Sequence, residues 1–245
     1  MMIEKPLNGK TVLITGGARR VGRLFALACG HAGANVIIHY GHSSQEALDL
    51  KDEIASFGSQ AWTLPSDLSN PEEVSRLISR ANEFGPLYGL VNSAAIFESL
   101  SFQDTKLEDW ERHISTNLTA PFLLSQAFAQ QISENGNGRI VNILDWRALR
   151  PGADHFPYTI SKAALAAMTN SLAVALAPRI TVNGLALGAI LPPSDGKVNE
   201  GMINTIPARR WSESNEVGDA LIFLLTGPAY ITGETIHVDG GRHLI

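Results

Sequence analysis

Short apolar runs alternate with longer helical segments along most of the chain, and this alternation constrains the fold more than any other feature. The first run, Thr11–Ile14, is followed by a glycine-rich turn and by a helical pattern that extends to about His31. Because strands that alternate with helices form a parallel sheet covered by helices, we predict an α/β fold. Further strands are expected at residues 35–39, 60–64, 87–91, 180–186 and 235–238, with another that ends at residue 145. Further helices are expected at residues 44–57, 107–132 and 157–176.

Two helix starts carry clear sequence signals, and one segment lacks any pattern. Ser44 is predicted as an N-cap, and Asn70 with Pro71 suits the N-cap and first-turn positions of another helix. Residues 191–210 contain several prolines and glycines, which predicts a variable substrate loop at the carboxyl edge of the sheet. At 245 residues, an α/β chain is expected to form a single domain over residues 1–245.

The composition excludes several classes of protein. A net charge of −5 without a Lys/Arg run gives no reason to expect nucleic acid or a membrane surface as partner. We expect no membrane span, because no apolar run reaches the roughly 20 residues that a span needs. The start of the chain also lacks the pattern of a signal peptide. Cys29 is the only cysteine, so we expect a buried packing residue in a reducing compartment and a cytoplasmic protein. The seven histidines show no metal-ligand spacing, and no metal is predicted.

The turn after the first strand has the features of a phosphate-binding turn. It comprises residues 15–22 and leads directly into a helix. Backbone N–H groups at a helix N-terminus bind a pyrophosphate. Gly16 and Gly17 allow the backbone to approach closely, and Gly22 allows the helix to pack against the strand. The alternative is a plain connection between a strand and a helix.

The end of the second strand favours NADP(H) over NAD(H). An NAD site usually has an acidic residue there to bind the ribose hydroxyls, whereas residues 39–44 contain none. Arg20, with Ser43 and His42, is instead expected to hold a 2′-phosphate, because arginine forms charge-assisted bonds to phosphate. The alternative makes Arg19 and Arg20 a solvated helix start and His42 a loop residue.

Three residues form a candidate proton-transfer group. Tyr158 and Lys162 lie one helical turn apart, so their side chains share a helix face. A nearby cation favours the phenolate, so we expect Lys162 to lower the pKa of the Tyr158 hydroxyl. Asp145 ends the apolar run 140–144 and is expected to join them.

With these residues placed, the chain resembles the short-chain dehydrogenase/reductase family over nearly its full length. The matching landmarks are Thr15–Gly22, Asp67 and Leu68, Asn92 to Ala94, Asn117, Tyr158 with Lys162, and Asp239 to Gly241. The resemblance implies a single Rossmann-type, doubly wound domain with strand order 3-2-1-4-5-6-7, in homodimers or homotetramers. It implies Tyr158 as proton donor, Lys162 as holder of the nicotinamide ribose and Asn117 as organiser of a water relay. The residues expected to bind NADP(H) are Gly16, Arg19, Arg20, Val21, His39, Tyr40, His42, Ser43, Asp67, Leu68, Asn92, Ser93, Ala94, Tyr158, Lys162, Gly188 and Ile190.

Departures from the common family pattern point to one branch. Arg20 stands where most members have Gly, and Asp145 where most have the catalytic Ser. Both substitutions, and the stretch 39–47, resemble pteridine and dihydromonapterin reductases. Phe97 matches the aromatic position that stacks a pterin in that branch. Ala95 departs from the pattern of this branch, in which Ser is frequent at that position. Leu187 departs from the pattern of the whole family, in which Pro is usual before Gly188.

The sequence therefore predicts an NADPH-dependent reductase of a pterin, with Phe97, Asp145 and Tyr158 contacting the substrate. Asp145 is expected to hold or relay a proton for the ring nitrogen through Tyr158 or a water, because an ionised carboxylate cannot donate a hydrogen bond as serine does. The alternatives are a general carbonyl reductase of 3-oxoacyl thioesters or small ketones, a repurposed enzyme of weak activity, and a non-catalytic NADP(H) sensor. Trp146 and Arg147 either line the substrate mouth or pack at the surface. Arg242 and His243 are either a charged tail or reach the pocket of a neighbouring subunit.

Overall fold

The computed structural model describes residues 5–192 and 200–245, and part of the predicted substrate loop, including Pro193 and Gly196, lies outside them. One seven-stranded sheet runs through the molecule in the order β3-β2-β1-β4-β5-β6-β7, with every pair parallel. This order confirms the predicted topology and fold class. The strands are β1 (Thr11–Ile14), β2 (Asn35–Tyr40), β3 (Ala61–Pro65), β4 (Leu87–Asn92), β5 (Gly138–Asp145), β6 (Ile180–Leu187) and β7 (Thr235–Val238).

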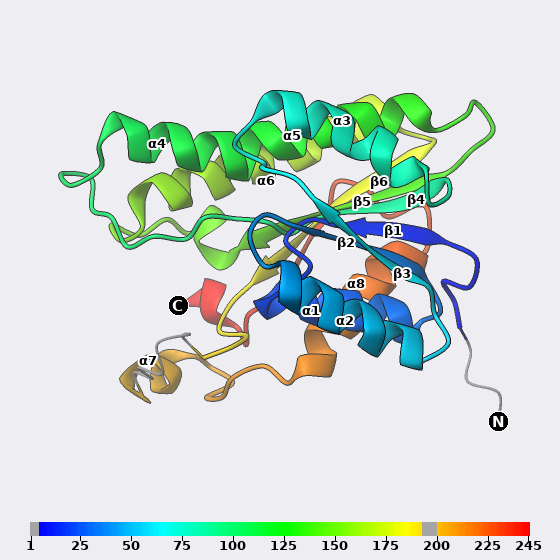
Figure 1. Ribbon diagram of the computed structural model, residues 1–245. Helices are drawn as coiled ribbons and strands as arrows, with labels where there is room; N and C mark the ends of the chain where they lie inside the picture. Colours follow the sequence, from blue (N-terminus) through cyan, green and yellow to red (C-terminus); the bar gives the residue numbers. More distant parts are fainter. Residues whose placement is uncertain (1–4, 193–199) are drawn as a thin grey trace.

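Helices cover both faces of the sheet (Figure 1). One layer contains α1 (Arg20–His31), α2 (Ser44–Ser56) and α8 (Ser214–Thr226). The other contains α3 (Pro71–Asn82), α4 (Leu107–Ile114), α5 (Ala120–Gln131) and α6 (Phe156–Leu176). Each layer closes its own apolar core, one around Phe25 and Leu221 and the other around Leu90 and Phe128. Because both faces are covered, the central strands are apolar throughout rather than alternating.

The helix starts follow local chemistry with one correction. Asn70 caps α3, since its side-chain oxygen accepts from the Glu72 backbone N–H at 3.0 Å, and Pro71 opens the helix as predicted. The prediction of Ser44 as an N-cap is wrong, because Ser44 is the first residue of α2 and Ser43 occupies the cap position. The Ser43 side chain makes no capping hydrogen bond.

Several elements differ from the predicted boundaries. The expected helix at 107–132 is divided by a π-helical turn at Ser115–Thr119. A short helix, α7 (Glu200–Thr205), lies within the segment predicted as a loop. The long helix α8 was not predicted, although Val217, Leu221 and Leu224 have helical spacing. The Glu216 carboxylate accepts from the Glu213 backbone N–H at 2.8 Å and so marks the start of α8.

One helix meets the length and composition of a membrane span, against the expectation that no segment would. This helix is α6, whose 21 residues are apolar enough by hydropathy. It also carries Lys162, which is buried within the domain, as are Tyr158 and Thr169 on the same helix. An apolar helix that packs its charged residue inside a domain is a core helix by the ordinary rules of burial.

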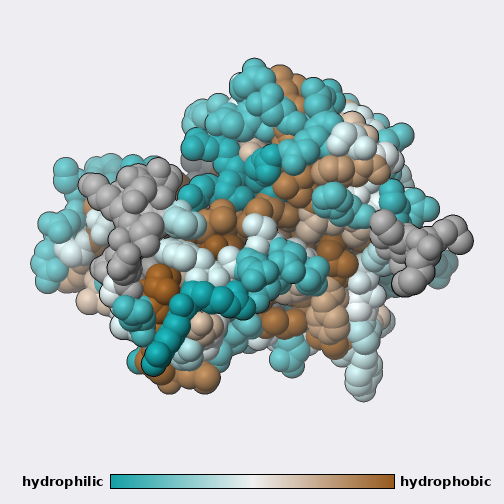
Figure 2. All heavy atoms as spheres, turned by 90° about the horizontal axis from the view of Figure 1, so that it is seen from below, coloured by the Kyte–Doolittle hydropathy of each residue, from teal (hydrophilic) through white to brown (hydrophobic). Residues whose placement is uncertain are grey.

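The face formed by α1, α2 and α8 is largely hydrophilic, with apolar residues in separate patches near its middle (Figure 2). Exposed apolar side chains of these helices include Leu48 and Phe223. Scattered apolar residues are normal on a protein surface.

Candidate active site

The carboxyl ends of the parallel strands bring the predicted site residues to one edge of the sheet. Gly16 follows β1, His39 ends β2, Asn92 ends β4 and Asp145 ends β5. Gly188 follows β6. In an open α/β sheet this edge is where ligands bind.

Tyr158 and Asp145 are in direct contact. The Tyr158 hydroxyl donates to Asp145 Oδ2 at 3.1 Å. Tyr158 lies in the first turns of α6 and is buried, whereas the Asp145 side chain keeps 15% of its surface exposed. Lys162 is also buried and its Nζ donates to the Ile143 carbonyl at 2.6 Å. The structure thus brings together a phenol, a carboxylate and an ammonium, as the sequence predicted.

The electrostatics of the group differ from the expectation. Burial, the charge of Asp145 and the hydrogen bond to Asp145 raise the pKa of Tyr158 well above its usual value, while Arg147 opposes the shift. The prediction that Lys162 lowers this pKa is wrong here. The ammonium lies 5.8 Å from the Tyr158 ring centroid and binds Ile143, so the carboxylate is the charge in contact with the hydroxyl. Burial also lowers the pKa of Lys162 to about 8, against the raising effect of Asp145.

Arg147 fixes the orientation of the Asp145 carboxylate. The Arg147 backbone N–H donates to Asp145 Oδ1 at 2.9 Å, and its guanidinium Nη1 lies 3.6 Å from the same oxygen. Asp154 holds the guanidinium in turn, accepting from Nη2 at 2.7 Å. The Arg147 side chain is 12% exposed. With Oδ1 engaged by Arg147, Oδ2 is left to face Tyr158.

Phe97 lies beside Tyr158 rather than in the core. Its ring centroid is 4.7 Å from that of Tyr158 in an edge-on arrangement and 4.1 Å from that of His155 in a stacked one. The residue is 55% exposed, which excludes core packing. His155 has a left-handed φ of +50° just before α6, and its Nδ1 lies 2.8 Å from the Glu98 carbonyl oxygen. An accessible aromatic face beside Tyr158 can stack a planar ligand.

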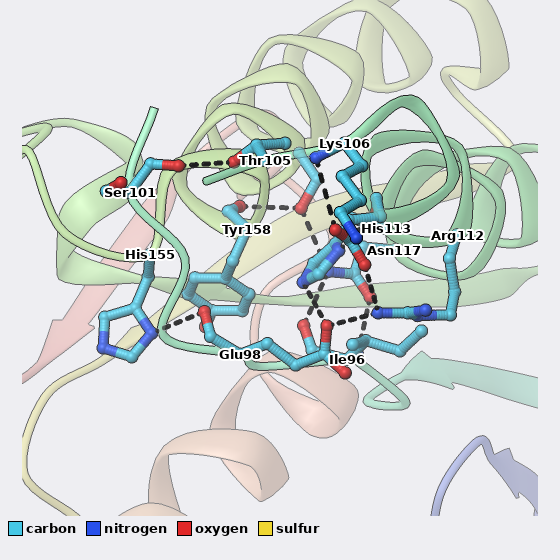
Figure 3. A network of polar contacts seen from close by, with 12 residues as sticks. Ile96, Glu98, Ser101, Thr105, Lys106, Arg112, His113, Asn117, His155 and Tyr158 are labelled. Atoms are coloured by element: carbon cyan, nitrogen blue, oxygen red, sulfur yellow. Dashed lines mark hydrogen bonds and ion pairs between the residues drawn. The ribbon is translucent and has the colours of Figure 1, made fainter. Parts of the chain in front are cut away.

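The backbone on both sides of Phe97 is held in place (Figure 3). The Asn117 side chain accepts from the Ile96 N–H at 2.8 Å and donates to the Ile96 carbonyl at 3.0 Å. On the other side, the Glu98 carbonyl oxygen lies 2.8 Å from His155 Nδ1, and the Glu98 carboxylate accepts from Arg112 at 2.5 Å. Asn117 also donates to Ser161 at 3.0 Å, so both hydrogens of its side-chain amide are used within the protein.

The glycine turn is locked to its neighbours by two polar side chains. Thr15 Oγ1 accepts from the backbone N–H groups of Ser93 and Ala94 at 2.9 and 3.1 Å. His39 Nδ1 accepts from the Gly16 N–H at 3.1 Å, so its protonated Nε2 donates to the Ser66 carbonyl at 3.0 Å. Both ring nitrogens of His39 are thus used inside the protein. Burial lowers the pKa of His39 to about 4, which keeps the ring neutral.

The glycines of the turn are required by close packing. Gly16 has a φ of +62°, and a Cβ there would lie 2.9 Å from the Ala94 Cα. A Cβ on Gly22 would lie 2.1 Å from the Gly16 carbonyl oxygen. Helix α1 begins at Arg20, where the first N–H groups have no acceptors within the helix. These N–H groups are the donors that the predicted phosphate site would use.

Cationic and hydroxyl side chains surround this helix start. Arg19 and Arg20 are exposed at its first turn, with His42 and Ser43 beyond the end of β2. Arg19 Nε lies 3.6 Å from the Glu46 carboxylate, while Arg20 donates to the Leu191 carbonyl at 3.5 Å. Arg20 has a left-handed φ of +53°, a conformation that glycine adopts without strain.

The remaining residues of the predicted cofactor set lie along the same edge. Leu68, Asn92 and Ile190 are buried, and Asn92 Oδ1 is buried without a hydrogen-bond partner among the described residues. Gly188 packs so closely on Asp239 that a Cβ would lie 2.6 Å from the Asp239 Cα. The other members are Val21, Tyr40, Asp67, Ser93 and Ala94, which are exposed or half-buried.

The C-terminal tail folds back on its own chain. The Arg242 guanidinium carbon lies 4.4 Å from the Trp146 ring centroid, and His243 Nδ1 lies 2.8 Å from Asp239 Oδ2. Among the described residues no cluster of three His, Cys, Asp or Glu side chains is placed to hold a metal. Arg242 therefore lies against the residue that follows Asp145, whereas His243 binds within the tail itself.

A family model described as enoyl-(acyl carrier protein) reductase matches residues 16–243. The chain belongs to the short-chain dehydrogenase/reductase family. It is accordingly an oxidoreductase.

Curated and solved members of this family match the chain over almost its full length. The 3-oxoacyl-[acyl-carrier-protein] reductase of a Synechocystis species is 34% identical over 240 residues, covering 96% of this chain and 97% of that protein. The L-rhamnose 1-dehydrogenase of Azotobacter vinelandii is 34% identical over 254 residues, with 96% and 97% covered. The structure of FolM alternative dihydrofolate reductase 1 from Brucella canis, complexed with NADP, superposes with a TM-score of 0.90 at 34% identity, covering 98% of this chain and 96% of that one.

Within this short-chain dehydrogenase/reductase, sequence reasoning missed the residues that support the central group. The pair Arg147 and Asp154 and the ring of His155 were not predicted to act on Asp145 or Phe97. Asp154 and His155 precede α6, where no periodic pattern indicates which way a side chain points. The sequence held only a weak signal, the arginine two residues after Asp145.

Proposed function

We propose that the protein is an NADPH-dependent reductase of a pterin of the dihydropterin or dihydromonapterin type. The contact between Tyr158 and Asp145 carries this proposal, because it joins a proton donor to a carboxylate where the family's common members have serine. A carboxylate there can return a proton to the phenol, but when ionised it cannot donate to a substrate carbonyl.

The cofactor proposed for the glycine turn is NADP(H). The first turn of α1 would bind the pyrophosphate, and Arg20 with His42 and Ser43 would bind the 2′-phosphate. The neutral His39 would support cofactor binding by holding the backbone of Gly16, rather than by contacting the cofactor itself. Several similar structures are described with NADP or NADPH, which supports this choice. When bound, the reduced nicotinamide supplies a hydride to the substrate.

The side chains of this chain would supply and orient the proton. Tyr158 holds its proton firmly at neutral pH, because burial and Asp145 raise its pKa. As the substrate nitrogen gains electron density, Tyr158 would donate to it, and Asp145 would relay the replacement proton from water. Lys162 would hold the nicotinamide ribose, and Asn117 would organise water through its backbone.

Substrate binding would use the exposed aromatic ring beside Tyr158. Phe97 offers a face for a planar pterin, and its position is fixed by the hydrogen bonds to the backbone of Ile96 and Glu98. The segment 191–210, which contains α7, is proposed as the variable substrate loop that covers the site.

A second candidate is a carbonyl reductase of 3-oxoacyl thioesters or small ketones. The 34% identity to a 3-oxoacyl-[acyl-carrier-protein] reductase favours it. Asp145 argues against it, since those substrates need a hydrogen-bond donor at their carbonyl oxygen. The third candidate is a sensor that binds NADP(H) without catalysis. The intact pair Tyr158 and Lys162 argues against it, because a sensor needs no proton donor.

The test is NADPH oxidation with dihydropterin, biopterin and an acetoacetyl thioester side by side. We expect turnover with the pterins and inhibition by methotrexate, because antifolates share the pterin ring. Turnover of the thioester alone would replace the pterin proposal by the carbonyl reductase.

We further propose a cytoplasmic homodimer or homotetramer. Phe122 of α5 and Val174 of α6 lie exposed on helices of the same layer. Burying such side chains between copies would remove them from water. Light scattering of the wild type and of Val174→Asp tests this: a monomeric wild type would contradict it.

A further inference from the structure

The His155 ring covers one face of the exposed Phe97 ring beside Tyr158. The ring centroids of His155 and Phe97 lie 4.1 Å apart, with an angle of 13° between the ring planes. Phe97 meets the Tyr158 ring edge-on, at 77° between the planes, and remains 55% exposed. Because one face of Phe97 is already stacked on an imidazole, its exposed surface is where a planar ligand would extend the stack.

A hydrogen bond to the backbone holds the His155 ring in this place (Figure 3). His155 Nδ1 lies 2.8 Å from the Glu98 carbonyl oxygen, so this nitrogen carries a proton and donates to it. The His155 side chain is 16% exposed. The bond joins the residue before α6 to the residue after Phe97, so the imidazole contacts the Phe97 segment through both its ring face and its nitrogen.

The local structure at the start of α6 does not explain a histidine at position 155. His155 occupies the N-cap position, but its side chain makes no capping hydrogen bond. Its φ of +50° and ψ of +47° are left-handed, a conformation that glycine and asparagine adopt more readily. Asparagine is also among the preferred N-cap residues. A strained residue that the helix start does not require is a candidate for a functional role.

The residue before His155 supports the other half of the site. Asp154 accepts from Arg147 Nη2 at 2.7 Å, and the Arg147 backbone N–H donates to Asp145. Asp154 therefore acts on the carboxylate beside Tyr158, whereas His155 acts on the aromatic ring. Loss of the His155 ring should alter ligand binding and leave the support of Asp145 in place.

We propose that His155 is a positioning residue for the substrate, because its ring fixes the plane of the Phe97 ring on which a flat ligand stacks. The inference rests on the proposed pterin function and adds to it a determinant of substrate affinity. His155 acts through Phe97 and needs no contact with the substrate. Without the His155 ring, Phe97 gains freedom to rotate, and ordering it again on binding costs affinity.

The test is calorimetry of biopterin with the NADP⁺-loaded His155→Asn variant. The asparagine amide can replace Nδ1 as donor to Glu98, and asparagine suits both the left-handed φ and the N-cap position, so the stacked ring is the main loss. We expect biopterin to bind about threefold to tenfold more weakly, as the loss of an aromatic pair predicts. KM for dihydropterin should rise by a similar factor, with a smaller effect on kcat. The urea midpoint should stay close to that of the wild type.

The variant His155→Phe separates ligand binding from fold stability. It restores a ring beside Phe97, but it lacks the donor to Glu98 and is strained at a left-handed φ. It should therefore bind biopterin more tightly than His155→Asn does, despite a lower urea midpoint. Affinities that instead follow the urea midpoints would show a purely structural role and overturn the inference.

The matched control is His31→Asn, because His31 stacks on Phe57 in the other helix layer, with the centroids 3.8 Å apart and 16° between the planes. It should leave biopterin binding unchanged. Wild-type affinity and KM in His155→Asn, or a wild type that does not bind biopterin, overturns the inference. Failure of the pterin function is seen separately: a wild type that binds biopterin but does not oxidise NADPH with dihydropterin removes the reductase function alone.

Discussion

The Tyr158 hydroxyl donates a hydrogen bond of 3.1 Å to Asp145 Oδ2, so the phenol of this protein is in direct contact with a carboxylate. Two consequences follow for the pair. The phenol keeps its proton at neutral pH, and in the reaction proposed above the carboxylate would relay a replacement proton from water after transfer. The same contact requires that Asp145 be held in one orientation, which is the role that the structure gives to Arg147.

Replacing Arg147 by Gln should lower kcat for pterin reduction about tenfold, with a smaller effect on KM. The guanidinium that fixes Asp145 Oδ1 and opposes the rise in the Tyr158 pKa is then lost. Steady-state kinetics across pH should show a shifted profile, with partial recovery in Arg147→Lys. Arg76→Gln, at an exposed position of α3, is the control. An Arg147→Gln profile identical to the wild type would remove Arg147 from this role.

The reduction rate should fall above about pH 8, the pKa of Lys162. Burial lowers this pKa from 10.5, so the ammonium loses its proton at a lower pH than a free lysine. Below pH 8 the charge is present, and above it the charge that would hold the ribose is lost. The pH dependence of kcat/KM measures this fall in rate at high pH. In Lys162→Arg the fall in kcat/KM should move to higher pH. A fall that stays near pH 8 in that variant would show that another group causes it.

Arg20→Gly should separate the two properties of this residue. The variant should raise KM for NADPH about tenfold or more while KM for NADH changes little, since only NADPH carries the 2′-phosphate. It should also stabilise the fold by about 1 kcal/mol, because glycine adopts the left-handed φ of +53° without strain. Arg20→Lys keeps the charge and the strain. Unchanged NADPH preference in Arg20→Gly would contradict the phosphate assignment.

His39 should make the fold sensitive to acid. Its folded pKa of about 4 lies below the value of 6.5 for a free imidazole, so the unfolded chain binds more protons between these values. Stability from this group is present above pH 6.5 and is lost as the pH falls towards 4. The free energy of unfolding should drop by about 2 kcal/mol more between pH 7 and 5 in the wild type than in His39→Gln. Urea titrations measure it, with the exposed His31→Gln as control; equal slopes in wild type and His39→Gln would refute the assignment.

The sequence predicts the sheet because each strand carries its own local signal. β1 and β7 were placed with their observed bounds, and Asn70 and Pro71 mark the start of α3 through chemistry within three residues. The turn after β1 likewise contains its own constraint, since Gly22 must approach Gly16. Such features depend on neighbours in the chain.

The support around the site depends instead on distant residues. The stacking of His155 on Phe97 joins segments far apart in the chain, and a left-handed φ at His155 aims the ring. His39 on β2 contacts Gly16, which follows β1, and Ser66, which follows β3. Only the fold shows that both of its ring nitrogens face inwards. The direction of the Tyr158 pKa shift was missed for the same reason, because spacing alone does not show that Lys162 turns to Ile143.

The most direct test of the account compares the wild type with Asp145→Ser in NADPH oxidation with a dihydropterin and with an acetoacetyl thioester. If the carboxylate returns the proton to Tyr158, the serine variant should lose about 100-fold in kcat/KM for the pterin and gain relative activity towards the thioester. Pterin reduction at the wild-type rate in Asp145→Ser would contradict the account.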